Sequence, residues 1–518
     1  MSLRTAKPST QKSYFNKFLD LVENGGNKLP HPVTLFVVMA LVVVIISALA
    51  ASAGLEASYE RVVNGKAETV TVKAISLLTV EGIRRIFSEA VKNFTSFAPL
   101  GTVLVAMIGV GVAEGTGLIQ TALRKLVLST PKKLITAVVV FAGVMSNIAS
   151  DAGYVVLVPL GALVFLSFKR HPLAGLAAAF AGVSGGFSAN LLVGTLDPLL
   201  AGISQQSAQM FQPGYLVNAT DNWYFMAVST FLITLLGTWI TERVVEPRLG
   251  AYKGEVNEDS ALTTISKKER KGLLFAVVAL AAYSALILLM VAPTNGILRS
   301  PEGEILKNSA FMNGLVPIIA GAFFVPGPAF GIAAGTIRND KDVANYMGKS
   351  MATMGGYIVL VFFAAQFVSY FSWSNLGTIL AVKGADFLKS TGMTGLPLII
   401  GFILVSAFIN LFIGSASAKW AIRAPVFVPM LMALGYSPAF TQVAYRIGDS
   451  TTNIITPLMS YFAVIVAFAQ KYDKNIGVGT LISSMLPYSI VFFLGWTALL
   501  IIWFLFGLPL GPGAFIRM

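Results

Sequence analysis

Repeated apolar stretches of membrane-spanning length constrain this chain more than any other feature. A helix needs roughly 20 apolar residues to cross a bilayer. Seven uninterrupted stretches meet that need: Val33–Gly54, Ala98–Leu118, Trp223–Val245, Gly272–Ala292, Phe311–Gly335, Met351–Phe371 and Leu481–Phe506. Two more, Pro172–Leu200 and Ala444–Phe468, contain polar interruptions. The pattern predicts an all-α polytopic membrane protein with nine transmembrane helices.

The composition supports a membrane location. Of 518 residues, 55% are hydrophobic and 12% are charged, whereas a soluble globule averages about 25% charged residues. Soluble cores stop growing beyond roughly 250–300 residues, so they would not bury this apolar surplus. The net charge of 37 − 24 = +13 lies mostly at the ends of apolar stretches, which is typical of topology determinants. We therefore expect no nucleic-acid partner.

Two apolar stretches are too long for one crossing and predict re-entrant helical hairpins. Leu134–Phe168 would extend roughly 50 Å as a helix, against a hydrocarbon core of about 30 Å. Small and polar residues interrupt it at 146–153, and pairs of basic residues flank both ends, so both ends are expected in the cytoplasm. Leu396–Leu434 is interrupted at Gly414–Ala418 and is followed by a segment without Lys or Arg. This second hairpin is expected to enter from the outside.

A basic loop divides the chain into two similar halves. In the hairpins V-L-V-P (Val156–Pro159) matches V-F-V-P (Val426–Pro429), and in the interrupted stretches G-G-F-S-A-N-L-L (Gly185–Leu192) matches G-D-S-T-T-N-I-I (Gly448–Ile455). Because the hairpins enter from opposite sides, the halves are predicted to be inverted-topology repeats with a site near the midplane. The predicted parts are a cytoplasmic N-terminal segment (1–32), the first repeat (33–245, with hairpin 134–168 and interrupted helix 172–200), a cytoplasmic linker (246–271) and the second half (272–518, with hairpin 396–434 and interrupted helix 444–468).

Small polar residues at the hairpin tips and helix breaks are candidates for substrate binding. Unwound backbone at membrane depth is tolerated where it is buried in protein or lines a wet cavity. The uncharged candidates are Asn147, Asn190, Ser415, Ser417 and Asn453. Hydrogen bonding between packed helices is the alternative explanation for any single Ser or Thr among them.

Charged residues near the breaks are stronger indicators, because a charge at the bilayer centre costs at least about 2.5–3.5 kcal/mol. Arg446 is a candidate to hold a substrate carboxylate. Asp449 is a candidate to carry a proton or, with Asn453, to ligate a sodium ion, and Asp197 is the next coupling candidate. Arg446 and Asp449 are three residues apart on one helical face, so a structural ion pair between them is the alternative.

Other residues near the second hairpin have two interpretations. Trp420 follows the hairpin tip, where stacking on an aromatic substrate competes with anchoring at the membrane interface. Pro438 and Pro457 are expected to shape the backbone at the site. With no Cys, two His and no G-x-x-x-x-G-K-[ST] motif, we expect no cofactor, no firm metal site, no enzyme and no ATP-driven pumping. The energy is expected to come from a proton or sodium gradient.

Several long motifs resemble the p-aminobenzoyl-glutamate transporter (AbgT) family. They are Gly26–Phe36, Asn93–Val105, Arg170–Leu192, Gly414–Trp420, Ala444–Pro457 and Gly507–Gly513. The resemblance implies a homodimer of nine spans and two hairpins per subunit in a bacterial inner membrane. It also implies secondary transport of p-aminobenzoyl-glutamate, and export of p-aminobenzoate-type compounds, including sulfonamide antimetabolites. The family's site residues fall on Asp197, Ser417, Trp420, Pro438, Arg446, Asp449 and Pro457.

The leading hypothesis is therefore an ion-coupled transporter of aromatic carboxylates with a cytoplasmic N-terminus. An ion-coupled carrier of aliphatic dicarboxylates is the alternative, because other inverted-repeat hairpin transporters use similar Ser and Asn tips. A membrane-embedded hydrolase and an ion channel are the competing classes. Direction of transport, coupling ion and natural substrate stay open.

Overall fold

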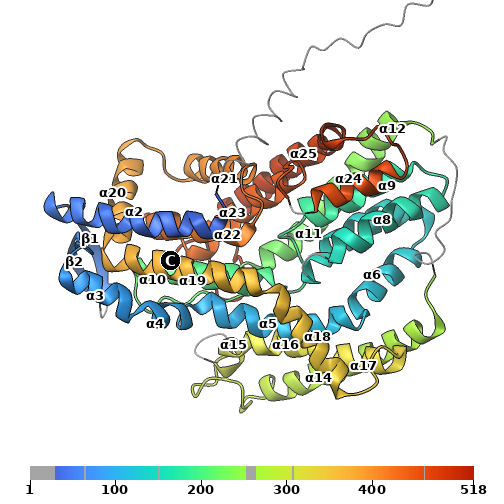
Figure 1. Cartoon of the computed structure of the whole chain (residues 1–518), viewed down its shortest axis with the longest axis horizontal. Coiled ribbons are helices and arrows are strands. Elements are labelled where there is room, and N and C mark those ends of the chain that lie inside the picture. The colour runs from blue at the N-terminus through green and yellow to red at the C-terminus, as the bar shows by residue number, and fades with distance from the viewer. Residues whose placement is uncertain (1–29, 64–65, 150–151, 253–263, 306–308, 460) are drawn as a thin grey trace, which may run out of the picture.

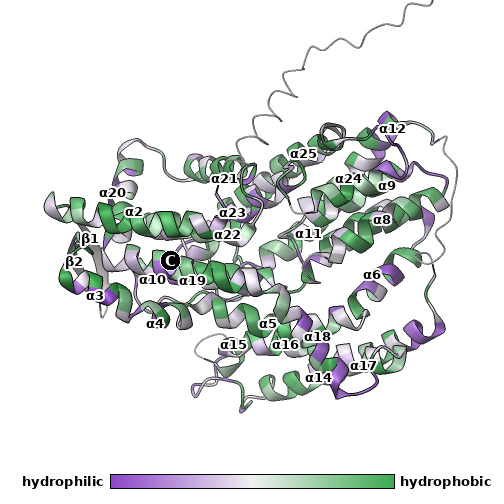
Figure 2. Ribbon diagram, in the orientation of Figure 1, coloured by the Kyte–Doolittle hydropathy of each residue, from purple (hydrophilic) through white to green (hydrophobic). Residues whose placement is uncertain are grey.

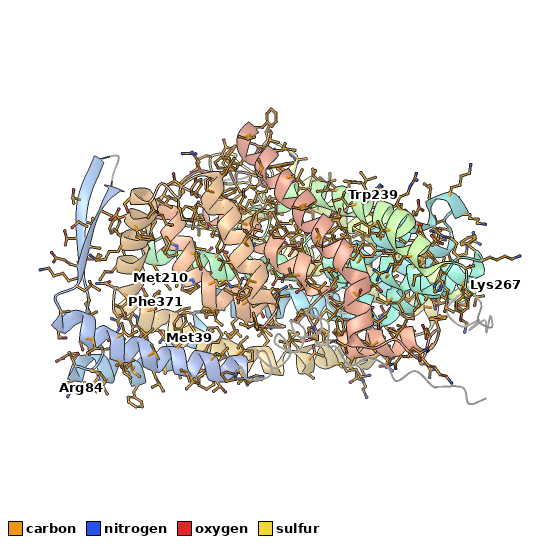
Figure 3. All side chains as sticks on the ribbon, turned by 90° about the horizontal axis from the view of Figure 1, so that it is seen from above. Met39, Arg84, Met210, Trp239, Lys267 and Phe371 are labelled. Atoms are coloured by element: carbon orange, nitrogen blue, oxygen red, sulfur yellow. The ribbon has the colours of Figure 1, made fainter. Side chains whose placement is uncertain are left out.

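The computed structural model describes residues 30–63, 66–149, 152–252, 264–305, 309–459 and 461–518. Most of the predicted N-terminal segment, and part of the predicted linker, lie outside these ranges. In Figure 1 the helices α2 (Pro32–Ser52) and α19 (Gly355–Trp373) lie side by side along the long axis of the molecule. Seen from above, Arg84 and Lys267 lie near opposite ends of that axis (Figure 3).

Within the described ranges, six helical stretches are long and apolar enough to cross a membrane. They are α2, α11 with its extension η4 and α12 (Trp223–Leu249), α14 (Lys267–Val291), α16–α17 (Leu315–Ala334), α19 and α25 (Val478–Phe506). A bent pair, α5 (Ala98–Gly115) and α6 (Leu118–Leu128), makes a seventh candidate. Hydrophobic residues run along helices such as α2, and hydrophilic residues gather at ends such as α12 (Figure 2). These seven match the seven uninterrupted stretches. A count of nine also needs both interrupted stretches to cross, which stays a prediction.

Each half contains a helix that the sequence did not predict. In the first half α5 bends by 60° into α6, and Gly117 at the bend has φ 89°. In the second half α20 (Leu376–Ser390) follows α19, and Asn375 between them has φ 59°. Both joints use a left-handed residue, a conformation that Gly and Asn tolerate best. Amphipathic helices precede these pairs in both halves. In the first half they are α3 (Val80–Ser88) and α4 (Ala90–Thr95), which precede α5, and in the second half α18 (Asp340–Thr353) precedes α19.

Helix pairs occupy both predicted hairpin ranges. The first pair is α7 (Ile135–Ser146) and α8 (Ala152–Ser167), with a short 3₁₀ turn at 147–149. The second pair is α21 (Leu396–Asn410) and α22 (Ala416–Ala433). The second pair is antiparallel, because the Phe402 and Phe427 rings lie 4.7 Å apart while Lys419, eight residues before Phe427, bonds Asn410, eight residues after Phe402. Entry and return through one membrane face stays a prediction for both pairs.

The two interrupted stretches are broken as expected, but their limits differ from the prediction. The first consists of α9 (Pro172–Phe180), a π turn η3 (Ala181–Gly185), non-helical residues 186–195 and α10 (Leu196–Phe211). The second consists of α23 (Pro438–Asn453) and α24 (Phe462–Gln470). The α23 helix begins six residues before the predicted Ala444, because Ser437 caps Phe440 N at 3.2 Å and Pro438 occupies the first turn. The halves interlock, since α10 packs on α22 and α23 packs on η3.

The expectation of an entirely α-helical chain was wrong in one segment. Strands β1 (Glu56–Val63) and β2 (Lys66–Lys73) form an antiparallel hairpin with Glu56 opposite Lys73. Alternating residue types on either side of an Asn-Gly pair are a strong hairpin signal, and Asn64-Gly65 provides that pair. Ala57 on β1 packs against Ile379 and Val382 of α20, so the hairpin covers one end of the helical bundle (Figure 1).

The last described residues return to the start of α23. Ser437 N donates to Ile516 O at 2.9 Å, and Phe225 N, in α11, donates to Leu510 O at 3.1 Å. The Ser437 hydroxyl also donates to Phe515 O at 2.6 Å. This segment therefore ties the beginning of α23 to the beginning of α11.

Candidate substrate site

A cavity of about 460 Å³ lies where the two helix pairs and the two broken helices meet. Its wall includes Asn147 from the first hairpin tip and Gly414–Ser417 from the second. Phe187 and Thr195 come from the first break, and Asn453, Met459 and Tyr461 come from the end of α23 and the break after it. Four of the predicted substrate-binding residues line this cavity: Asn147, Ser415, Ser417 and Asn453.

Aromatic side chains form much of the remaining wall. Tyr154 and Tyr461 stack with ring centroids 4.9 Å apart and an interplanar angle of 2°. Phe187 and Tyr357 also line the cavity, and the Tyr357 hydroxyl donates to Pro99 O at 2.8 Å. Sequence reasoning missed all four. Phe187 was within reach, because it lies inside the G-G-F-S motif that matched between the halves, whereas the Tyr154–Tyr461 pair joins residues far apart in the chain.

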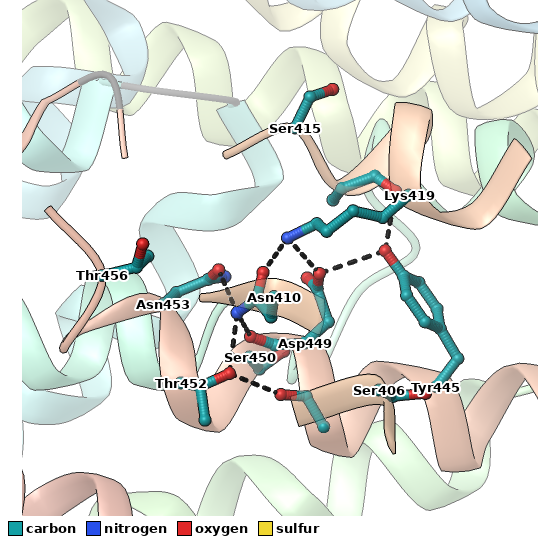
Figure 4. Close-up of polar contacts among 12 residues, drawn as sticks. Ser406, Asn410, Ser415, Lys419, Tyr445, Asp449, Ser450, Thr452, Asn453 and Thr456 are labelled. Atoms are coloured by element: carbon teal, nitrogen blue, oxygen red, sulfur yellow. Dashed lines mark hydrogen bonds and ion pairs between the residues drawn. The ribbon is translucent and has the colours of Figure 1, made fainter. Parts of the chain in front are cut away.

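Asp449 forms a fully buried ion pair with Lys419. The Lys419 Nζ lies 2.5 Å from Asp449 Oδ1, and the two side chains are 0% and 1% exposed. The same Nζ also bonds Asn410 Oδ1, and the Tyr445 hydroxyl lies 3.1 Å from Asp449 Oδ1. Figure 4 shows these groups between α22 and α23. A positive charge of the chain itself therefore neutralises Asp449.

Asn410 connects the second hairpin to α23 and was missed by sequence reasoning. Its Nδ2 donates to Asp449 O at 2.6 Å, to Thr452 Oγ1 at 2.8 Å and to Asn453 Oδ1 at 2.9 Å (Figure 4). It occupies the last position of α21, directly before the tip. A sodium ion at Asp449 and Asn453 would compete with the Lys419 ammonium for Asp449 and with the Asn410 amide for Asn453.

Arg446 pairs with Asp197 across the two halves. Arg446 Nη1 lies 2.7 Å from Asp197 Oδ1, with side-chain exposures of 1% and 14%. In the part of the chain that the structure describes, the contact is an ion pair without a hydrogen bond, and the three guanidinium nitrogens have no hydrogen-bond partner. Asp197 Oδ2 accepts from Gly194 N at 2.7 Å. The alternative ion pair between Arg446 and Asp449 does not form, because each residue pairs with another group.

Trp420 lies behind the cavity wall. It is fully buried, it stacks on Tyr445 with centroids 4.6 Å apart, and its Nε1 donates to Ser204 Oγ at 3.0 Å. The structure therefore places it in protein and not at a membrane interface. In this arrangement the four lining aromatic residues, and not Trp420, face the cavity.

The other predicted residues do not line the cavity. Asn190 accepts from Leu192 N at 3.2 Å within the first break. Pro438 begins α23, and Pro457 lies in the non-helical residues after it. Most of the predicted residues therefore lie in one of two groups: the residues that line the cavity, and a layer of buried charged residues.

The buried layer carries more positive than negative charge. Lys419, Arg423 and Arg446 are buried cations on α22 and α23, whereas Asp197 and Asp449 are the carboxylates that pair with two of them. Arg423 Nη2 has no hydrogen-bond partner among the described residues, although its guanidinium lies 5.5 Å from the Tyr445 ring centre. Uncompensated buried cations favour an anionic ligand nearby.

Spanning-length helices around a cavity lined by broken helices define the class of membrane transport proteins. The comparisons with known proteins agree. The family model described as "AbgT putative transporter family" matches residues 17–518, so the chain belongs to the AbgT family of transporters. The resemblance inferred from the motifs is confirmed.

Three similar proteins support the assignment to the AbgT family. The chain is 41% identical over 518 residues, the full length of both sequences, to the p-aminobenzoyl-glutamate transport protein of Escherichia coli (strain K12). It is similar to the crystal structure of the Alcanivorax borkumensis YdaH transporter, at 46% identity and a TM-score of 0.87, over 93% of this chain and 100% of that one. It is also similar to Neisseria gonorrhoeae MtrF, described as illuminating a class of antimetabolite efflux pumps, at 53% identity and a TM-score of 0.91, over 96% of this chain and 100% of that one.

Proposed function

We propose that the chain is an ion-coupled secondary transporter of p-aminobenzoyl-glutamate and p-aminobenzoate-type aromatic carboxylates, and that it exports sulfonamide antimetabolites. The observation that carries the proposal is the cavity with aromatic walls between the two hairpin tips. The printed names of the relatives, p-aminobenzoyl-glutamate transport and antimetabolite efflux, support the same substrate class. The protein would act as a homodimer of inverted-repeat subunits in a bacterial inner membrane, with a cytoplasmic N-terminus.

Aromatic substrates suit this cavity better than aliphatic dicarboxylates do. Aromatic pairs gain about 0.5–1.5 kcal/mol beyond the area that they bury, and Tyr154, Phe187, Tyr357 and Tyr461 all line the wall. The surplus of cations behind the wall, Lys419, Arg423 and Arg446 against two carboxylates, supports a negatively charged substrate. The negative charge of the substrate would then offset the surplus positive charge of the site.

The two buried ion pairs are the proposed coupling elements. Lys419–Asp449 links α22 to α23, and Arg446–Asp197 links α23 to α10. A coupling ion acts by changing the relative stability of two conformations, and removal of one buried partner is strongly destabilising. Either a proton or a sodium gradient would act through Asp197 and Asp449, and the coupling ion is left to experiment.

The test is flux in proteoliposomes that contain the purified protein. Labelled p-aminobenzoyl-glutamate and p-aminobenzoate are measured with a proton gradient, a sodium gradient, both or neither, and ionophores collapse each gradient as a control. The proposal predicts flux of at least one compound that depends on a gradient and is inhibited by the other compound but not by succinate. Gradient-dependent flux of succinate alone would support the aliphatic alternative, and absence of any gradient-dependent flux would contradict the proposal.

A further inference from the structure

Asn147 lines the cavity and carries a buried hydrogen-bond acceptor without a partner among the described residues. Its amide group is oriented by two backbone carbonyls, because Nδ2 donates to Val144 O at 3.1 Å and to Gly186 O at 3.5 Å. Its Oδ1 has no hydrogen-bond partner among the described residues, although the residue is only 7% exposed. A buried acceptor without a partner costs about 1–3 kcal/mol, so a ligand that donates a hydrogen to this oxygen is favoured.

The opposite hairpin tip contributes hydroxyl groups and the beginning of a helix to the cavity wall. The α22 helix begins at Ala416, and the residues Gly414–Ser417 line the cavity. Ser415 Oγ accepts from Ala418 N at 3.3 Å and lies 3.2 Å from Ser417 Oγ. The first backbone N–H groups of a helix lack intrahelical partners and attract anions. Asn147 itself follows the last residue of α7, and the C-terminal end of a helix favours positive or donor groups.

We propose that these two tips impose one orientation on the ligand. An aromatic amine donates a hydrogen to Asn147 Oδ1, the ring lies against the Tyr154–Tyr461 pair, and the carbonyl or carboxylate on the far side of the ring faces Ser415 and Ser417. The inference rests on the proposed function for the substrate class and adds the recognition of an aryl amine by Asn147. The residue therefore determines specificity for a donor group para to the acid.

The experiment compares two competitors that differ only at the proposed donor. p-Toluate keeps the ring and the carboxylate of p-aminobenzoate and replaces the amine by a methyl group. Both are titrated as inhibitors of labelled p-aminobenzoate transport in proteoliposomes. An unpaired buried acceptor predicts that p-toluate is weaker by roughly 5- to 140-fold in the wild-type protein. In Asn147→Ala the two competitors should be about equally potent.

The chain offers a matched control. Asn222 is also a buried asparagine, its Nδ2 bonds a backbone carbonyl, Ala439 O, at 2.9 Å, and its Oδ1 lacks a partner in the described structure. It does not line the cavity, so Asn222→Ala should keep the wild-type ratio of the two inhibition constants. Ser417→Ala should weaken both competitors in parallel, because both carry the carboxylate.

Three results would overturn the inference. Equal potency of p-toluate and p-aminobenzoate on the wild-type protein would do so without any variant, and so would an unchanged ratio in Asn147→Ala. If Asn147→Ala does not fold, Asn147→Ser keeps a hydroxyl that can donate to Val144 O and removes the amide oxygen that the aryl amine is proposed to bond. Failure of the wild-type protein to transport p-aminobenzoate or its glutamate conjugate would overturn the proposed function as well, whereas transport of p-aminobenzoate with equal potency of the two competitors would overturn only the orientation.

Discussion

The two broken-helix regions resemble each other in backbone and differ in chemistry. In the first, small residues let the helices pack closely: Gly143 of α7 lies against Gly182 of η3, and Gly161 of α8 lies against Gly175 of α9. In the second, α22 and α23 carry four buried charges: Lys419, Arg423, Arg446 and Asp449. The single charge that the described part of the first region contributes to the site is Asp197, which pairs with Arg446.

This difference indicates that the two halves have different roles in transport. Close packing through glycine gives rigid contacts between helices, because the backbones approach one another directly. Buried charges instead depend on their partners, and each pair is stable only while both members are present. We therefore expect the second region to respond to ions and anionic substrates, while the first region provides a fixed surface and the one carboxylate that links the halves.

The largest expected effect is the loss of the buried Asp449 charge. Asp449→Asn leaves the Lys419 ammonium buried without its counter-charge, which should cost roughly 3–5 kcal/mol of stability. Thermal unfolding in detergent measures this cost, and flux in proteoliposomes should fall to background. As a control, Lys419→Met combined with Asp449→Asn removes both charges and should recover most of the stability without recovering transport. A single variant as stable as the wild type would contradict the role given to this pair.

A smaller effect is expected at the contact between the halves. Asp197→Asn should cost about 2–3 kcal/mol, below the range for a fully buried pair, because Asp197 is 14% exposed and the amide oxygen can still accept from Gly194 N. Unfolding midpoints and flux rates measure the two consequences. If the charge links the halves, Asp197→Glu should keep more transport than Asp197→Asn. The opposite order would argue against an electrostatic link.

A steric change tests the packing of the first region. A Cβ on Gly182 would overlap Val140 O and lie 3.0 Å from Gly143 Cα, so Gly182→Ala should destabilise the protein by about 1–3 kcal/mol. Gly348→Ala on α18 is the matched control, because a Cβ there meets no atom within 4 Å. The control should be neutral or slightly stabilising, since Gly in a helix costs roughly 0.5–1 kcal/mol relative to Ala. Equal unfolding temperatures for the two variants would contradict close packing at Gly182.

The last effect depends on pH and concerns Asp221, a buried carboxyl of the first half that has no ion-pair partner in the described residues. Burial raises its pKa to about 7, although hydrogen bonds from Asn218 oppose the shift. A raised pKa means that the folded state holds this proton more tightly than the unfolded state does. The contribution to stability is therefore complete below the unfolded pKa of 3.8 and is lost as the pH rises through about 7.

The Asp221→Asn variant tests the direction in which the stability changes with pH. At pH 3.5, below the unfolded pKa, the variant should match the wild type within about 0.5 kcal/mol, and at pH 5 and above it should be increasingly the more stable protein. Unfolding temperatures across this pH range provide the comparison. A wild-type protein that gains stability relative to the variant as the pH rises would reverse the assignment.

The sequence predicted the backbone of the site better than its contacts. The limits of both helix pairs follow from the length of a bilayer crossing and from runs of small residues such as Gly414–Ala418, so local composition was sufficient. The bend at Gly117 and the extra helix α20 depend on left-handed residues, which flanking hydropathy does not reveal. The strands β1 and β2 were overlooked although Asn64-Gly65 gave the signal.

The ion-pair partners of Arg446 and Asp449 could not be predicted from the spacing of residues within one helix. Arg446 and Asp449 lie on one helix, and their spacing suggested a pair, yet their partners come from α10 and α22. Ion pairs between distant segments are decided by how the halves dock, which the spacing within one helix does not report. The same holds for Tyr154 and Tyr461, whose stacking creates the aromatic wall.

The most direct test of the substrate site is a structure of the protein in lipid nanodiscs with saturating p-aminobenzoyl-glutamate. We expect ligand density in the cavity between the hairpin tips, with the ring beside Tyr154 and Tyr461 and polar contacts to Asn147 and Ser417. Density for a transported ligand in the separate cavity lined by Arg248, Asn475 and Thr480, with the cavity between the tips empty, would contradict this expectation.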